Sequence, residues 1–546
     1  MENRSRSTSD IFVQPYATSS QASLLQEAHE TLLTKEALQF INSLIQSFAN
    51  DIEKLESQRL YRQWKIRRGQ YVFDFLPEGV GIRSENWKIH SLPPCLYDRR
   101  VDLGDVDPSN ASQLLSALQS EAQGVQIDFD DGFCPHWYNV LIGHYNVYKA
   151  CRGYLSVEKE VSSSQISPSK TILSLPFSPY IMFRPRAFNM IERNIFVKGK
   201  RIPGSLFDFG LHIFHNGKIL NSFTHGGPFF YLSKLEEWKE ALLWNRIFNW
   251  TENKISLPFG SIKACVLIES LPAVFQMDEI LWALKEHSAG LNCGMWDYAA
   301  SFIARLGHKT NKLFPDRSKY VTMKQMFLAK YRSLLIATCH RRGAPATGGM
   351  FAGFSGMASK NFQKLKEEAE MAKGEDALCG ADGGLVYDII LVPYVQQTFQ
   401  RIFGNNKCNQ IDTLSQYPSS LLICKEDLLT IPEGGATLEG LELNIEVSLH
   451  FIENWIKKRG HFILHQRVED SATAEISRLQ VWQQLLHGVP FEGKPLEGRF
   501  LRFDKPPSSV TLPLVWTEAT YFIWKVETRM FLSTECVETK ELDAIT

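Results

Sequence analysis

Short apolar runs alternate with amphipathic segments through the middle of the chain. The runs have the length of buried strands, and several are followed by stretches with apolar residues at helical spacing. The predicted strands cover residues 100–103, 125–129, 180–184, 228–235, 262–270, 290–296, 344–350 and 384–388. The predicted helices between them include residues 235–253, 275–287, 323–340 and 387–403. This alternation predicts an α/β fold, a (β/α)8 TIM barrel.

A doubly wound open sheet is the alternative architecture for the same alternation. It is less favoured, because no Gly-x-Gly-x-x-Gly motif follows the first predicted strand.

The pattern changes at both ends of the chain. Residues 1–22 are polar and predict disorder, whereas residues 23–63 place leucine, isoleucine and phenylalanine at helical spacings. After residue 404 the alternation stops, and residues 440–459 and 470–487 have the pattern of helices. We therefore predict three parts: residues 1–94, a disordered segment and a helical region; residues 95–404, the barrel; and residues 405–546, a largely helical domain.

Composition excludes some partners. The 546 residues are 44% hydrophobic and 22% charged with a net charge of -1, so nothing electrostatic favours nucleic acid or an anionic membrane as a partner. No apolar run reaches the roughly 20 residues of a membrane span. The ten cysteines contain no Cys-x-x-Cys pair. This favours reduced thiols in an intracellular compartment, cytoplasmic or peroxisomal/glyoxysomal, although the C-terminus is no Ser-Lys-Leu signal. The sequence leaves the oligomeric state open.

Three predicted strands end in charged residues. In a TIM barrel the active site lies at the carboxyl ends of the strands, where Arg184, Glu269 and Asp297 would be. Adjacent strands are about 4.8 Å apart, so Glu269 and Asp297 can share one hard cation. Two carboxylates with substrate oxygens and water suit Mg²⁺. Either carboxylate alone is more simply a salt-bridge partner or a helix cap; the pair beside an arginine favours a metal site. Arg186 competes with Arg184 for a functional role.

Two further features are open to two interpretations. Asp470 opens the predicted helix 470–487, where its ordinary role is an N-cap. It becomes a candidate general base only if that helix folds over the barrel mouth. The glycine pairs 348–349 and 383–384 flank the last two predicted strands, and either could allow close approach of a phosphate or pantetheine.

Several of these segments resemble one enzyme family. Residues 286–298, EHSAGLNCGMWDY, resemble the malate synthase signature His-x-x-Gly-Leu-Asn-x-Gly-x-Trp-Asp-Tyr. Residues 184–216, 262–281, 314–323, 334–350 and 469–478 are similar to further blocks of the family, form A type. The resemblance implies a Mg²⁺-dependent Claisen condensation of acetyl-CoA with glyoxylate, then thioester hydrolysis to malate and CoA, as in the glyoxylate cycle. It also implies an N-terminal helical clasp and a C-terminal helical plug.

The resemblance also assigns roles to residues of this chain. It implies that Glu269 and Asp297 bind Mg²⁺, that Asp470 is the base, and that Arg184 stabilises the enolate and contacts substrate. Backbone N–H groups in one short segment would orient glyoxylate, namely those of Gly294, Met295, Trp296 and Asp297.

The chain departs from the family pattern in three places. Residues 187–189 are Ala-Phe-Asn where the family usually has Gly-(Trp/Leu)-His, and residues 384–388 replace a segment with Ala-His-Pro-Gly beside the acetyl-CoA pocket. The sequence after about residue 488 does not resemble the closing helices of the family. A non-catalytic relative acting as a binding or scaffold protein is therefore an alternative, as is a lyase cleaving malyl-CoA-like thioesters. The presence of all four chemical residues and of the plug motif at 469–475 favours the active synthase.

Overall fold

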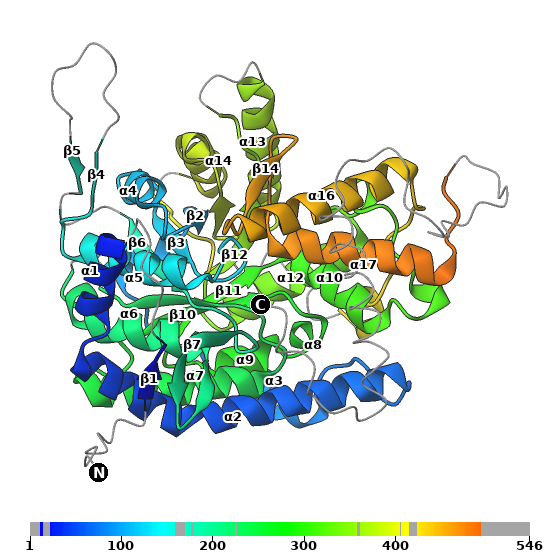
Figure 1. Cartoon of the computed structure of the whole chain (residues 1–546). Coiled ribbons are helices and arrows are strands. Elements are labelled where there is room, and N and C mark those ends of the chain that lie inside the picture. Colours follow the sequence, from blue (N-terminus) through cyan, green and yellow to red (C-terminus); the bar gives the residue numbers. More distant parts are fainter. Residues whose placement is uncertain are drawn as a thin grey trace, which may run out of the picture.

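A closed parallel barrel forms the centre of the molecule. The computed structural model describes residues 11–14, 22–158, 170–173, 175, 179–223, 226–356, 361–404, 406–413 and 423–492. In this part of the chain the barrel strands follow the order β10-β11-β12-β13-β2-β3-β6-β9. Most of these strands are labelled in Figure 1. They are β2 (Val101–Val106), β3 (Gly124–Asp128), β6 (Tyr180–Arg184), β9 (Phe229–Leu232), β10 (Lys263–Ile268), β11 (Ser288–Cys293), β12 (Ala346–Phe351) and β13 (Gly383–Val386). Each predicted strand overlaps an observed one, which confirms the (β/α)8 fold.

Helices cover the outside of the barrel between consecutive strands. They are α4 (Ala111–Leu118), α5 (Trp137–Cys151), α6 (Gly204–Asn221), α7 (Trp238–Ile255), α8 (Leu271–Val274), α9 (Met277–Ala283), α10 (Met295–Leu306), α11 (Arg317–Tyr320), α12 (Met326–Arg341), α13 (Phe362–Leu378) and α14 (Val392–Phe403). Short 3-10 turns occur at η1 (Pro77–Gly79), η2 (Pro94–Tyr97), η3 (Thr310–Lys312) and η4 (Ile389–Leu391). The predicted helices correspond to α7, α9, α12 and α14.

One predicted boundary is wrong, and it concerns the site. The strand predicted to reach Trp296 ends at Cys293, because Gly294 is the N-cap of α10 and Met295 already begins that helix. Asp297 therefore lies in the first turn of a helix, four residues after the end of the strand.

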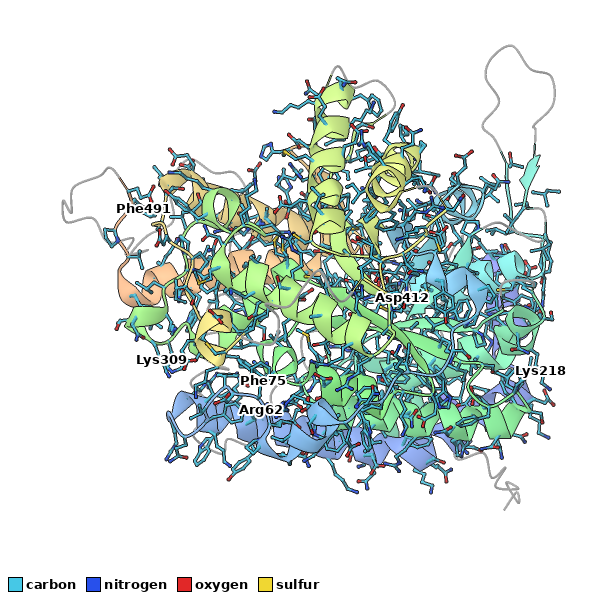
Figure 2. The ribbon with its side chains drawn as sticks, turned by 180° about the vertical axis from the view of Figure 1, so that it is seen from behind. Arg62, Phe75, Lys218, Lys309, Asp412 and Phe491 are labelled. Carbon is cyan, nitrogen blue, oxygen red and sulfur yellow. The ribbon has the colours of Figure 1, made fainter. Side chains whose placement is uncertain are left out.

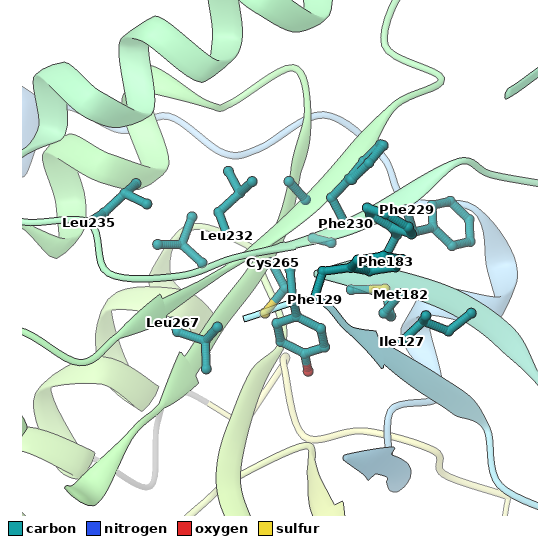
Figure 3. Packing of buried hydrophobic residues seen from close by; sticks show 14 of the residues in the cluster. Ile127, Phe129, Met182, Phe183, Phe229, Phe230, Leu232, Leu235, Cys265 and Leu267 are labelled. Carbon is teal, nitrogen blue, oxygen red and sulfur yellow. The ribbon is translucent and has the colours of Figure 1, made fainter. Parts of the chain in front are cut away.

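Aromatic side chains fill the layer between strands and helices. Phe183 of β6 stacks on His212 of α6, with ring centroids 4.0 Å apart, and Phe230 of β9 packs 5.1 Å from Phe209 of the same helix. Figure 3 shows Phe183 and Phe230 converging with Phe129 and Cys265 in this core. Successive side chains of a strand point to opposite faces, so Arg184 points into the barrel when Phe183 points out. The packing of β6 thus aims Arg184 at the barrel interior.

The N-terminal region packs along one side of the barrel. Its helices are α1 (Ala22–Leu32), α2 (Lys35–Arg67) and α3 (Val80–Ser84), and α2 runs beneath the barrel in Figure 1. Ion pairs fix α2 to the barrel: Arg59 lies 2.5 Å from Glu240, and Arg62, labelled in Figure 2, lies 2.7 Å from Glu236. The segment predicted to be disordered contains a short strand, β1 (Ile11–Val13). It pairs with β7 (Ile191–Val197), and β7 pairs in turn with β8 (Lys200–Pro203).

The C-terminal region brings a second pair of helices to the barrel. It contains α15 (Lys425–Leu428), α16 (Leu438–Ile456), β14 (Phe462–Leu464), β15 (Arg467–Glu469) and α17 (Ser471–His487). Helices α16 and α17 lie side by side, and α17 also packs against α10 (Figure 1). This agrees with the predicted helices 440–459 and 470–487. The end of the predicted helical domain, residues 493–546, lies outside the described residues.

A short antiparallel pair of strands lies outside the barrel, formed by β4 (Ser156–Glu158) and β5 (Lys170–Ile172). One of the paired glycines allows the chain to pack closely: a Cβ on Gly383 would lie 1.5 Å from the carbonyl oxygen of Arg99. In the described ranges, no helix has the length and apolarity needed to cross a membrane.

Candidate active site

Three carboxylates meet at the carboxyl end of the barrel. Asp131 follows β3, Glu269 follows β10, and Asp297 lies in the first turn of α10. One oxygen from each lies within 4.8 Å of the others. The predicted pair Glu269 and Asp297 is thus brought together, and Asp131 joins it. Hard carboxylate oxygens at this spacing can bind a divalent metal ion.

Gly294 makes this approach possible. A Cβ at position 294 would lie 2.9 Å from Cβ of Glu269, closer than two such carbons pack. The backbone N–H of Gly294 donates to the Tyr331 hydroxyl at 2.9 Å. This N–H therefore has a partner within the protein, and its part in orienting substrate stays a prediction. The absent side chain of Gly294 supplies space.

The amino end of α10 supplies donors instead. No side chain caps this helix, and the first N–H groups of any helix lack partners within it. These groups belong to the next residues, Met295, Trp296 and Asp297. A helix amino end with free N–H groups attracts small anions, so the start of α10 could bind a small anion; that these residues orient substrate stays a prediction.

Arg184 ends β6 among aspartates. Its guanidinium lies 3.2 Å from Asp128 and 3.2 Å from Asp130, and it also pairs with Asp131. These carboxylates raise the Arg184 pKa well above its usual value despite burial. The Arg184 Nε is buried and has no hydrogen-bond partner among the described residues. Arg184 therefore carries a permanent charge and a spare donor.

Arg186, the competing arginine, has a structural role. Its guanidinium binds Asp208 of α6 through Nε and Nη2, both at 2.8 Å, and lies 2.9 Å from Glu192 of β7. These bonds tie β6 to its surroundings on the helix side of the sheet. The preference for Arg184 over Arg186 is thus supported by the geometry.

Lys234 lies inside the carboxylate cluster, and sequence reasoning missed it. Its ammonium group is 2.5 Å from Asp297, 2.8 Å from Asp131 and 3.9 Å from Glu269. Its backbone N–H donates to Glu269 Oε1 at 2.5 Å. Lys234 has a left-handed backbone, with φ of 56°, which is strained for any residue but glycine.

The charges in the cluster depend on one another. Burial raises the pKa of Glu269 well above its usual value, and Lys234 partly offsets this. Burial and the neighbouring Asp131 raise the pKa of Asp297, again opposed by Lys234. For Asp131 the effect of burial is outweighed by Lys234 and Arg184, which hold its pKa well below the usual range. Asp131 is therefore the carboxylate of the three whose ionised form its neighbours favour most.

Asp470 reaches this cluster from the C-terminal helix α17. It is the predicted N-cap: the N–H of Thr473 donates to Asp470 Oδ1 at 3.0 Å. The next residue, Ser471, donates its hydroxyl to Asp131 Oδ1 at 2.5 Å and its N–H to the Asp131 carbonyl at 3.4 Å. The helix thus folds over the barrel mouth, which is the condition that the sequence could not decide.

The environment of Asp470 suits proton transfer. Burial and the negative charge of Asp131 raise its pKa to about 7, while the Thr473 N–H opposes the shift. A general base is most effective when its pKa lies near the working pH. Asp470 is therefore both a helix cap and a carboxylate able to exchange a proton near neutrality.

Two cavities lie at the carboxyl ends of the barrel strands. One of about 320 Å³ adjoins the carboxylates and is also lined by Asn189, Glu236 and Glu475. The other, of about 530 Å³, lies between α4, the end of β13 and residues 458–461 of the C-terminal region. Tyr387 and His461 line this second cavity and are joined by a hydrogen bond of 3.0 Å. The two departures from the family pattern, at 187–189 and 384–388, thus lie on different cavities.

Together, the fold and the site define a (β/α)8 protein with a carboxylate cluster that can hold a metal ion and with a further carboxylate, Asp470, brought to this cluster by the C-terminal region. Comparisons with known proteins agree. The model "Malate synthase, TIM barrel domain" matches residues 180–431, and "Malate synthase, C-terminal" matches residues 435–500.

Curated relatives extend the match to most of the chain. Malate synthase A of Escherichia coli (strain K12) is 36% identical over 505 residues, covering 92% of this chain and 90% of that protein. The malate synthase of Myxococcus xanthus is 39% identical, covering 84% and 82%. The glyoxysomal malate synthase of Gossypium hirsutum is 36% identical, covering 86% and 81%. The chain therefore belongs to the malate synthase family and is an acyl-transferring enzyme.

Proposed function

We propose that the chain condenses acetyl-CoA with glyoxylate at the carboxylate cluster and releases malate and CoA. The observation that carries this proposal is the position of α17, which holds Asp470 over Asp131, Glu269 and Asp297 through the Ser471–Asp131 hydrogen bond. A condensation of this kind needs a base for a weakly acidic methyl group and an electrophile beside it. The site offers a group for each task.

Glu269 and Asp297 would hold Mg²⁺, with Asp131 as the nearest third oxygen ligand. The all-oxygen donor set fits this ion. When bound, Mg²⁺ supplies Lewis acidity that polarises the glyoxylate aldehyde. The N–H groups at the start of α10 would bind the glyoxylate carboxylate and orient the aldehyde toward Asp470.

Asp470 would remove a proton from the acetyl methyl group, and the electrons of that C–H bond would move onto the thioester oxygen. Arg184 would stabilise the resulting enolate oxygen with its spare Nε donor. The enolate carbon then bonds to the aldehyde carbon, and the aldehyde oxygen gains a proton. Addition of water to the thioester carbon breaks the C–S bond and yields malate and the CoA thiol.

The larger cavity is the proposed acetyl-CoA pocket. It is lined by Lys458 and Arg459, which supply positive charge for phosphates, and it extends inward to Tyr387 and His461. His461 also bonds the carbonyl oxygen of Gly132, one residue from Asp131, at 2.8 Å. A chain that lies along this cavity would thus end beside the cluster.

The proposal is tested by following free thiol release from acetyl-CoA with glyoxylate and Mg²⁺ present, and with each omitted in turn. We expect release only when all three are present. No glyoxylate-dependent thiol would refute the condensation. Arg459→Ala should raise the KM for acetyl-CoA and leave the KM for glyoxylate unchanged; an unchanged KM for acetyl-CoA would place the pocket elsewhere.

The compartment is proposed from the thiols. None of the nine cysteines in the described ranges forms a disulfide, which suits a reducing compartment. Mass spectrometry of the protein from its native source, alkylated before lysis, should find no disulfide at these cysteines.

A further inference from the structure

Lys234 is the member of the cluster that the proposed reaction does not use. Its ammonium group lies at hydrogen-bonding distance from Asp297 and Asp131, and close to Glu269. A divalent metal held by the same three carboxylates would need the space between the same oxygens, at about 2.1 Å from each for Mg²⁺. The ammonium group and the metal ion cannot both use these oxygens from the same side.

The backbone of Lys234 is fixed on both sides. Its N–H donates to Glu269, and its carbonyl oxygen accepts a hydrogen bond of 2.8 Å from Arg59 of α2. The following carbonyl, of Leu235, accepts a bond of 2.7 Å from the Ser270 hydroxyl. The strained, left-handed conformation is thus held by its surroundings, as is typical of functional positions. It directs the side chain into the cluster.

The side chain itself has room to leave. The Lys234 side chain is 25% exposed, whereas those of Asp131 and Glu269 are 6% and 2% exposed. The exposed part faces the cavity of about 320 Å³, which is lined further on by Glu236 and Glu475. An ammonium group displaced from the cluster would find solvent and carboxylates there, while the anchored backbone stays in place.

We propose that Lys234 is an internal cation that occupies the metal-free carboxylate cluster and competes with the divalent metal for its oxygens. Without metal, the positive charge of Lys234 offsets part of the negative charge of the three carboxylates and keeps them close together. Metal binding displaces the ammonium group toward the cavity. Lys234 is therefore a positioning residue that sets metal affinity. The inference rests on the metal site of the proposed function but not on the condensation chemistry.

The test measures metal binding in the absence of both substrates. Mn²⁺, which shares the preference of Mg²⁺ for oxygen ligands, is titrated into the metal-free enzyme and the free ion is followed by electron paramagnetic resonance. In Lys234→Met the competitor is gone, so the Mn²⁺ dissociation constant should fall by a factor on the order of ten. The melting temperature of the metal-free protein should also fall, and Mn²⁺ should raise it by more than in the wild type.

Lys373 provides the matched control. It is also a buried lysine at the barrel: its Nζ donates to the Gly349 carbonyl at 2.5 Å and to Asp376 at 3.1 Å, outside the metal cluster. Lys373→Met should lower the melting temperature without changing the Mn²⁺ dissociation constant. Lys234→Gln serves as a second uncharged variant in case Lys234→Met does not fold.

Opposite results would overturn the inference. If Mn²⁺ binds Lys234→Met or Lys234→Gln as weakly as the wild type, or more weakly, Lys234 does not compete but is neutral or supports the ligands. Because substrates are absent, this result is independent of thiol release. An enzyme that binds Mn²⁺ as expected but releases no thiol would refute the condensation and leave the competition intact.

Discussion

The hydrogen bond between Ser471 and Asp131 links the base-bearing helix to the metal cluster, so its removal tests the geometry of the site. Ser471→Ala deletes the hydroxyl that donates to Asp131 Oδ1 at 2.5 Å. The Asp470 cap itself is unaffected, since Thr473 provides its partners. The change therefore loosens the connection between α17 and the barrel without removing any proposed chemical group.

The size of the effect follows from the bond. Hydrogen bonds to charged groups contribute about 1.5–3 kcal/mol. If this energy is used to hold Asp470 in position for proton transfer, kcat should fall by roughly 10- to 150-fold, since about 1.4 kcal/mol is a factor of ten. Metal affinity should change little, because Glu269 and Asp297 are untouched and Asp131 keeps its carboxylate, losing only one hydrogen bond.

Ser477→Ala is the matched control on the same helix. Ser477 is fully buried, but its hydroxyl donates to the Thr473 carbonyl of its own helix at 2.8 Å. The assay compares kcat, both KM values and Mn²⁺ binding for the two variants. A Ser471→Ala enzyme with wild-type kcat would refute the view that this bond positions the base. An equal loss in Ser477→Ala would attribute the effect to helix stability.

Three further predictions concern single groups. Asp470 must be ionised to act as a base, so kcat/KM should fall as the pH drops through about 7. Because its pKa is raised in the folded protein, its bound proton stabilises the fold at low pH, and this contribution is lost as the pH rises from 3.8 to 7. Asp470→Asn should remove this pH dependence of the free energy of unfolding. Arg184→Lys keeps the charge but not the fork of donors, so kcat should fall by about 100-fold. Arg186→Lys should mainly lower the melting temperature. A large loss of kcat in Arg186→Lys and none in Arg184→Lys would assign the functional role to Arg186. Gly294→Ala places a Cβ 2.9 Å from that of Glu269, which should cost about 1–3 kcal/mol by overpacking and weaken Mn²⁺ binding; normal binding would show that the site can widen.

Much of the fold could be predicted because barrel strands are buried on both faces. Such strands appear in the sequence as short apolar runs, and β6 was predicted with both of its ends correct. The run 290–296 shows the limit of this signal. Met295 and Trp296 continue the apolar pattern although the strand has ended, and a short apolar run does not distinguish a strand from the first turn of a helix.

The site was predictable only where its residues end strands. Glu269 and Arg184 could be found this way, and the same rule could have found Asp131, which lies just after the strand predicted at 125–129. Lys234 gave no such signal, because a lysine in a left-handed conformation is set by its tertiary surroundings. For Asp470, the sequence predicts the cap, but only the packing of α17 against the barrel shows what the carboxylate faces.

The central claim is that Asp470 is the base of a metal-dependent condensation. Its most direct test is thiol release by Asp470→Asn at saturating acetyl-CoA, glyoxylate and Mg²⁺, with Mn²⁺ binding measured on the same preparation. Asparagine caps a helix as well as aspartate does, so the fold should persist. Asp427→Asn, which changes a capping aspartate of α15 that accepts the Cys424 N–H at 3.0 Å, is the control. The account predicts that thiol release is abolished in Asp470→Asn and normal in Asp427→Asn, with Mn²⁺ binding retained in both; an Asp470→Asn enzyme that turns over at the wild-type rate would contradict it.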